Sequence, residues 1–154
     1  MPKVAIIMGS ESDRAIMEEA LPYLEYFGIE ADVRVMSAHR TPDRVQEFVS
    51  KAKANGYAAI IAGAGMAAHL PGVAAAYTTL PVIGVPLAGS ALNGVDALYA
   101  IVQMPAGVPV ATMAIGKAGA RNAAIFAAQL IALQDKTIAE KLDQFKTNQC
   151  RLPK

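Results

Sequence analysis

The sequence is poor in charge and in cysteine, and each shortage excludes a class of protein. Charged residues make up 18% of the 154 residues, whereas an ordinary soluble domain carries about 25%. The net charge of +1 provides no attraction to nucleic acid or to an anionic membrane. The single cysteine, Cys150, excludes an internal disulfide and a cluster of cysteine metal ligands.

Long uninterrupted apolar runs are also missing, although the middle of the chain is almost free of charge. No formal charge occurs from Ala54 to Val95, and Asp96 is the only one before Lys117. Prolines and glycines divide this stretch, so no segment reaches the roughly 18 apolar residues of a membrane-spanning helix. Such short apolar segments are typical of buried parallel strands, and their abundance favours burial between subunits. The first residues show no signal-peptide pattern, so we expect a cytoplasmic protein without membrane contact.

Apolar segments and helical patterns alternate along the chain, which predicts βαβ units. We predict strands over 3–8, 30–36, 57–62, 81–85 and 110–115. We predict helices over about 13–27, 42–55, 72–79, 93–103 and 117–145, the last either as one helix or as two with a second start at Asp135. Pro22 should kink the first helix and Gly28 should close it, while Thr41 should cap the second.

The predicted fold class is a flavodoxin-like three-layer α/β sandwich. Right-handed crossovers would wind a parallel sheet of five or nearly five strands, covered by helices on both faces. With 54% hydrophobic residues, the chain can bury a substantial core. We expect residues 1–154 to form a single catalytic domain with a helical C-terminal extension from about residue 135.

Three polar or glycine-rich loops follow predicted strands, over 9–13, 37–42 and 63–72. Ligands of such sheets bind at the carboxyl ends of the strands. The two histidines, His39 and His69, lie in two of these loops. We therefore expect a ligand site where the three loops meet.

The first two loops carry groups suited to a phosphorylated sugar. Hydroxyls and backbone N–H groups in 9–13 suit a phosphate at a helix N-terminus, and the Asp13 carboxylate suits a sugar hydroxyl. Alternatively, Ser12 and Asp13 only cap the helix. In 37–42, Arg40 can bind phosphate oxygens in a bidentate manner and His39 can exchange a proton near neutral pH. The alternative is a solvated surface loop.

The third loop contains glycines spaced like a dinucleotide-binding fingerprint, but the match fails. The fingerprint belongs to the first strand–helix turn and needs an acidic residue about 20 positions later. Here it follows the third predicted strand. We expect the glycines to admit close approach of a ligand, with Ala67 and Ala68 as an apolar wall. His69 alone is more typical of a structural histidine, and two histidines 30 positions apart make a weak metal site.

Five motifs in these regions resemble, in order and spacing, the class I PurE family, whose members are N5-carboxyaminoimidazole ribonucleotide mutases of purine biosynthesis. The resemblance covers almost the whole chain. The loop Ala67–Gly72 is similar to the mutase class and differs from the related carboxylase class, which uses free CO2. The motifs are Gly9-Ser-Glu-Ser-Asp13, Ser37-Ala-His-Arg-Thr-Pro42, Ala67-Ala-His-Leu-Pro-Gly72, Pro81-Val-Ile-Gly-Val-Pro86 and Ile101-Val-Gln-Met-Pro105.

The resemblance implies an isomerase that moves a carboxylate from N5 to C4 of an aminoimidazole ribonucleotide. It implies no metal, ATP or organic cofactor, and a homo-octamer whose sites are built from more than one subunit. His39 matches the catalytic histidine, which would act as general acid and base. The resemblance places the substrate-binding residues at Ser10, Ser12, Asp13, Ser37, Arg40, Gly65, Ala67 and His69.

Met66 departs from the family pattern, which has glycine there. A side chain at this position would narrow the pocket, and a positive φ would strain it. Three other functions stay open from the sequence: a CO2-using carboxylase, a flavodoxin-like binding or signalling module, and a structural oligomer whose loops only cap helices.

Overall fold

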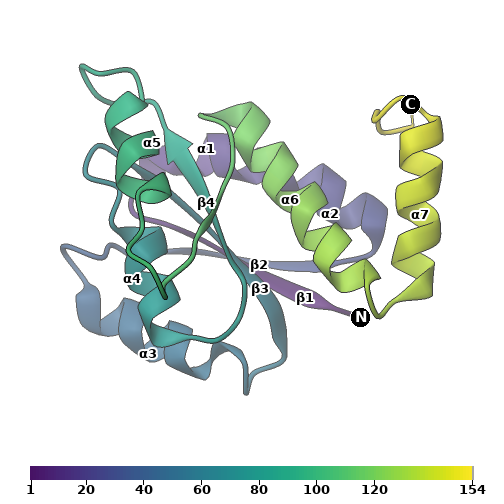
Figure 1. The fold of residues 1–154 in the computed structure, drawn as a ribbon, viewed down its shortest axis with the longest axis horizontal. Helices are drawn as coiled ribbons and strands as arrows, with labels where there is room; N and C mark the ends of the chain where they lie inside the picture. The colour runs from purple at the N-terminus through teal and green to yellow at the C-terminus, as the bar shows by residue number, and fades with distance from the viewer. Residues whose placement is uncertain (154) are drawn as a thin grey trace.

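A five-stranded parallel sheet forms the centre of the protein, as a computed structural model describes it for residues 1–153 (Figure 1). The strands are β1 (Lys3–Met8), β2 (Glu30–Val35), β3 (Tyr57–Gly65), β4 (Val82–Leu87) and β5 (Ala111–Thr112). Their spatial order is β2-β1-β3-β4-β5. This is the flavodoxin-like strand order, and it confirms the predicted fold class.

Helices cover both faces of the sheet and give three layers (Figure 1). One face carries α1 (Arg14–Met17), α2 (Leu21–Phe27) and α6 (Lys117–Ala132), and α7 (Lys136–Thr147) packs outside α6 and α2. The other face carries α3 (Pro42–Ala52), α4 (Leu70–Tyr77) and α5 (Val95–Val102). No helix within residues 1–153 is both long and apolar enough to cross a membrane.

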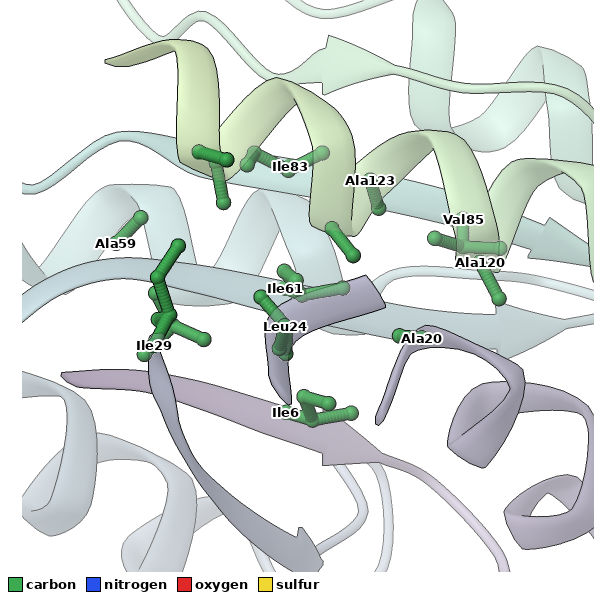
Figure 2. Close-up of a cluster of buried hydrophobic side chains, with 14 of the residues drawn as sticks. Ile6, Ala20, Leu24, Ile29, Ala59, Ile61, Ile83, Val85, Ala120 and Ala123 are labelled. Atoms are coloured by element: carbon green, nitrogen blue, oxygen red, sulfur yellow. The ribbon is translucent and has the colours of Figure 1, made fainter. Parts of the chain in front are cut away.

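The alternation of side chains along β1 divides the core into two clusters. Ile6 packs in the cluster beneath α2 and α6, while Ile7 packs in the cluster beneath α3, α4 and α5. Both side chains are fully buried, and each contributes about 1.5–3 kcal/mol through removal from water. Figure 2 shows the first cluster, in which Ala120 and Ala123 of α6 lie against the sheet. These small side chains let a helix approach the strands closely.

The first helix is interrupted near Pro22, where the sequence predicted a kink. A 3-10 turn, η2 (Glu18–Ala20), separates α1 from α2. Pro22 has no N–H to donate to the carbonyl of Glu18, so the regular hydrogen-bond ladder cannot continue. Gly28 ends α2 with φ of 76°, the left-handed cap that the sequence predicted.

Two strands are longer than predicted, because pairing continues through residues that usually end a strand. β3 continues to Gly65, since Gly63 pairs with Met8 of β1 and Gly65 pairs with Leu87 of β4. β4 continues through Pro86, which pairs with Ala64. Pairing with a neighbouring strand therefore overrides the local preferences of glycine and proline.

β5 is shorter than predicted, and Pro86 provides the physical reason. The Pro86 carbonyl accepts a hydrogen bond from Gly116 N–H at 2.9 Å, so this residue directs its backbone polar groups toward β5. Proline has no N–H to donate in return, and the ladder between β4 and β5 is interrupted there. Regular pairing is limited to Ala111 and Thr112.

Helix α7 begins where the sequence predicted a second start. The Asp135 carboxylate accepts a hydrogen bond from the backbone N–H of Ile138 at 3.1 Å. This bond satisfies one of the donors that the first turn of a helix leaves unpaired. Tyr23, Tyr26 and Phe27 of α2 contact Phe145 of α7, so the cap supports a helix that is packed on the domain.

We expect Asp135→Ala to destabilise the protein by about 1 kcal/mol through loss of this cap, which lowers Tm by about 2–4 °C. Asp143→Ala is the matched control, because Asp143 is an exposed aspartate inside the same helix. Its effect should stay within about 0.5 kcal/mol. Thermal denaturation of both variants measures the difference, and equal shifts would contradict the capping role.

Candidate functional site

A cavity of about 310 Å³ opens at the carboxyl edge of the sheet. The loops that follow β1, β2, β3 and β4 all contribute to its lining. His39 and all eight substrate-binding residues that the family resemblance implied lie in this lining. The lining consists of Gly9, Ser10, Ser12, Asp13, Ser37, Ala38, His39, Arg40, Ala64, Gly65, Met66, Ala67, His69, Leu70 and Gly89.

The register of the sheet brings the three loops together. Met8, the last residue of β1, pairs with Val35 of β2 on one side and with Gly63 of β3 on the other. Because all three strands are parallel, their loops begin at nearly the same level of the sheet. Segments far apart in the sequence therefore surround one cavity.

The loop after β1 presents two hydroxyls and one carboxylate. Ser10 Oγ lies 2.9 Å from Ser12 Oγ, and the Ser10 side chain caps the 3-10 turn η1 (Glu11–Asp13). Asp13 makes no side-chain cap to α1, so the alternative that it only caps the helix is wrong for this residue. Burial raises the pKa of Asp13 above its ordinary value of 3.8, although a hydrogen bond with the Ser10 backbone lowers it.

The loop after β2 is closed by reciprocal hydrogen bonds between Ser37 and Thr41. Ser37 N–H donates to Thr41 Oγ1 at 2.9 Å, and Thr41 Oγ1 donates to the Ser37 carbonyl at 3.2 Å. Thr41 occupies the N-cap position of α3 as predicted, but its hydroxyl makes no cap bond to that helix. Ser37 Oγ also accepts the N–H groups of His39 (3.3 Å) and Arg40 (3.1 Å). The closed turn presents the imidazole and the guanidinium on adjacent residues.

The two histidines contact each other, which the sequence did not predict. His39 Nε2 lies 2.7 Å from His69 Nδ1, and the two rings meet edge to face at 85°. One nitrogen must donate and the other accept, so the contact couples the tautomers of the two rings. It also connects the loop after β2 to the loop after β3.

The glycine-rich segment differs from the expectation at two residues, Gly63 and Ala68. A Cβ on Gly63 would lie 2.3 Å from Met17 Sδ, so Gly63 accommodates helix packing and does not line the cavity. Gly65 does line it. Ala67 forms part of the expected apolar wall, whereas Ala68 is 1% exposed and lies in the core.

Met66 has a positive φ of 54°. The backbone strain that was expected for a side chain at such an angle is therefore present. Met66 is 62% exposed and lines the cavity.

Sequence reasoning missed the contribution of the fourth strand. Gly89 lies in the loop after β4 and lines the cavity together with residues of the other three loops. The available signal was that a fourth parallel strand must end at the same edge of the sheet. A glycine carries no chemistry of its own, so residue type gave no indication.

The fold and cavity define a flavodoxin-like α/β protein with an imidazole and guanidinium site at the carboxyl edge of its sheet. A model of the AIR carboxylase family matches residues 3–151. The chain belongs to this family, which confirms the resemblance found in the sequence.

The relatives include proteins of well-matched length. The chain is 58% identical to the N5-carboxyaminoimidazole ribonucleotide mutase of Brucella melitensis, over 95% of this chain and 90% of that protein. It is 54% identical to the mutase of Escherichia coli K12, over 96% of this chain and 87% of that protein. The crystal structure of Treponema denticola PurE superposes with a TM-score of 0.88 at 30% identity, over 97% of this chain and 92% of that chain.

The environment of Asp13 predicts a pH-dependent stability. Because the pKa is raised in the folded chain, the ionised carboxylate disfavours folding at neutral pH. This penalty disappears as the pH falls through the raised folded pKa toward the ordinary value of 3.8.

Asp13→Asn should therefore raise Tm by about 1–2 °C at neutral pH, and the gain should shrink as the pH approaches about 4. Thermal denaturation across this pH range measures the effect. Asp143→Asn is the control, because Asp143 is exposed and belongs to none of the loops that line the cavity. A gain that grew on acidification would contradict the effect of burial on Asp13.

Proposed function

We propose that this protein is an N5-carboxyaminoimidazole ribonucleotide mutase, an isomerase of purine biosynthesis, in which His39 acts as general acid and base. Curated relatives of this name are 58% and 54% identical over nearly the whole chain. The observation that carries the residue assignments is the single cavity that joins His39 and Arg40 to the Ser10–Asp13 loop and the Gly65–His69 segment. We further propose that the chain acts as one catalytic domain.

The polar residues of the cavity suit the phosphate and the ribose of a ribonucleotide. Arg40 provides a charged fork for phosphate oxygens, and the hydroxyls of Ser10, Ser12 and Ser37 provide further donors. Ser37 Oγ already accepts two backbone N–H groups, so its own proton stays available to a ligand. The Asp13 carboxylate would accept from ribose hydroxyls. These contacts would hold the aminoimidazole ring beside the histidine pair.

The reaction needs one proton donor and one proton acceptor, and a single imidazole can serve as both. The exocyclic N–C bond of the carbamate breaks, its electron pair stays on nitrogen, and that nitrogen takes a proton from His39. The ring then supplies an electron pair from C4 to the released CO2, which forms the new C–C bond. The C4 proton finally returns to His39. Atoms and charge balance without an external oxidant, reductant or nucleotide, in agreement with the expectation of no cofactor.

His69 would position the catalytic ring. Its Nδ1 lies 2.7 Å from His39 Nε2, close enough to fix the orientation of His39 and the nitrogen that carries the proton. The apolar part of the lining, which includes Ala64, Ala67 and Leu70, would surround the CO2 between the two steps and limit access of water.

We also propose that the protein assembles as a homo-octamer, with sites built from more than one subunit. The chain exposes large apolar side chains on and beside α5, namely Leu92 (63% exposed), Val95 (43%), Tyr99 (63%) and Val102 (47%). Val95, Tyr99 and Val102 are spaced by four and three residues and so share one side of α5. An exposed apolar surface of this kind is typical of a protein interface. We place the enzyme in the cytoplasm, because a phosphorylated substrate does not cross a membrane unaided.

Two neighbouring substitutions separate catalysis from binding. His39→Asn should reduce kcat by about 10²-fold or more while substrate binding persists, because the proton shuttle is lost. Arg40→Ala should mainly raise KM, since a charge-assisted contact worth about 1.5–3 kcal/mol is removed. Steady-state kinetics with the N-carboxylated substrate measure both parameters, and calorimetric titration measures binding.

Near-normal kcat in His39→Asn would contradict its role, and an unchanged KM in Arg40→Ala would remove Arg40 from the phosphate site.

The wild-type enzyme should convert the N-carboxylated ribonucleotide in preference to aminoimidazole ribonucleotide with bicarbonate. The opposite preference would favour the carboxylase.

The α5 surface predicts the effect of a charge on assembly. Tyr99→Glu should dissociate the oligomer into smaller species, because a carboxylate would be buried at an apolar interface. Leu133→Glu is the control, since Leu133 is 82% exposed after the end of α6. Sedimentation velocity distinguishes the species. Unchanged assembly in Tyr99→Glu would exclude this face as the interface.

A further inference from the structure

Met66 combines an unfavourable backbone conformation with an exposed apolar side chain. Its φ of 54° lies in the left-handed region, which is unfavourable for a residue with a side chain. Asn93 has a similar φ of 53°, but asparagine tolerates this region because its amide can bond to the nearby backbone. Methionine has no such group. At 62% exposure, the Met66 side chain also recovers little free energy from burial.

The turn itself explains the angle but not the side chain. Ala68 N–H donates to the Met66 carbonyl at 2.9 Å, and His69 N–H donates to the Ala67 carbonyl at 2.8 Å. These two successive tight turns lead from β3 into α4 and bring His69 to His39. Glycine would adopt the same φ at Met66 without strain. Neither backbone preference nor packing therefore accounts for a methionine here.

The position of Met66 in the cavity suggests what the side chain does. Met66 lines the cavity, and the lining also includes the apolar residues Ala64, Ala67 and Leu70. The alanines are short, and Leu70 is 2% exposed and fixed in the core. Among these apolar lining residues, Met66 alone has both the length and the freedom to fold over a bound ligand. Methionine is well suited to this role, because it is unbranched and polarisable and adapts to irregular gaps.

We propose that Met66 is a retention residue, whose side chain closes the apolar wall over the CO2 released in the first step. This inference rests on the proposed function and deepens it. After the N–C bond breaks, CO2 either bonds to C4 or diffuses out and leaves aminoimidazole ribonucleotide. A closed apolar wall favours recombination and excludes water. The backbone strain at residue 66 is then retained because it places this side chain at the mouth of the cavity.

The test follows the fate of the migrating carboxylate. A substrate with a ¹³C-labelled carbamate is converted in buffer that contains unlabelled bicarbonate, and NMR measures labelled product, unlabelled product and aminoimidazole ribonucleotide. A sample without enzyme corrects for spontaneous loss of CO2. The wild-type enzyme should retain the label in the C4 carboxylate. If wild type forms no C4-carboxylated product at all, the proposed function fails, and this result is separate from the behaviour of Met66.

Three variants separate the side chain from the backbone. Met66→Gly removes both the side chain and the strain, Met66→Ala removes the side chain but keeps the strained φ, and Met66→Leu keeps apolar bulk. Both small variants should release severalfold more aminoimidazole ribonucleotide per turnover and lose label from the product, whereas Met66→Leu should resemble wild type. Met66→Gly should also raise Tm, because the strain is removed.

Full label retention in both Met66→Gly and Met66→Ala would overturn the proposal. Loss of label in Met66→Gly alone would overturn it as well, because loop flexibility and not the side chain would then be responsible. Sedimentation velocity on the same samples gives the third criterion. If the leaking variants are also dissociated, Met66 is an interface residue and the retention role is wrong.

Discussion

The parallel pairing of β1 with β2 on one side and with β3 on the other is the constraint on which the site depends. Met8 lies between Val35 and Gly63, so three chain reversals begin at one level of the sheet. Buried side chains on both faces hold this register, since Ile6 and Ile7 enter opposite core clusters. A slip of one residue would exchange these faces, which makes the register and therefore the cavity difficult to deform.

Hydrogen bonds within and between the loops hold the site residues in place. The reciprocal bonds between Ser37 and Thr41 close the turn that carries His39. The contact of His39 with His69 then fixes that turn against the segment after β3. Rigid strands and closed turns hold the imidazole in position more accurately than a mobile loop would, and the proposed proton transfers require such accuracy.

The site also contains groups that are unfavourable for folding. Burial raises the pKa of Asp13, so its ionised carboxylate lowers the free energy of unfolding at neutral pH. Met66 has a left-handed backbone without the burial that would offset it. Both residues line the same cavity, whereas the core clusters beneath it consist of well-buried apolar side chains. Two features that are unfavourable for folding thus lie where the proposed chemistry takes place.

The sequence by itself determined the alternation of strands and helices, the flavodoxin-like class, the caps at Gly28 and Asp135 and the residue types of the site. Each of these depends on local periodicity, cap chemistry or turn residues. Only the tertiary structure decided that β3 runs through Gly63 and that Thr41 binds Ser37. It alone brought His39 to His69 and placed Gly89 at the cavity. These outcomes depend on contacts between distant segments, which become available only when the parallel strands pair and their loops meet.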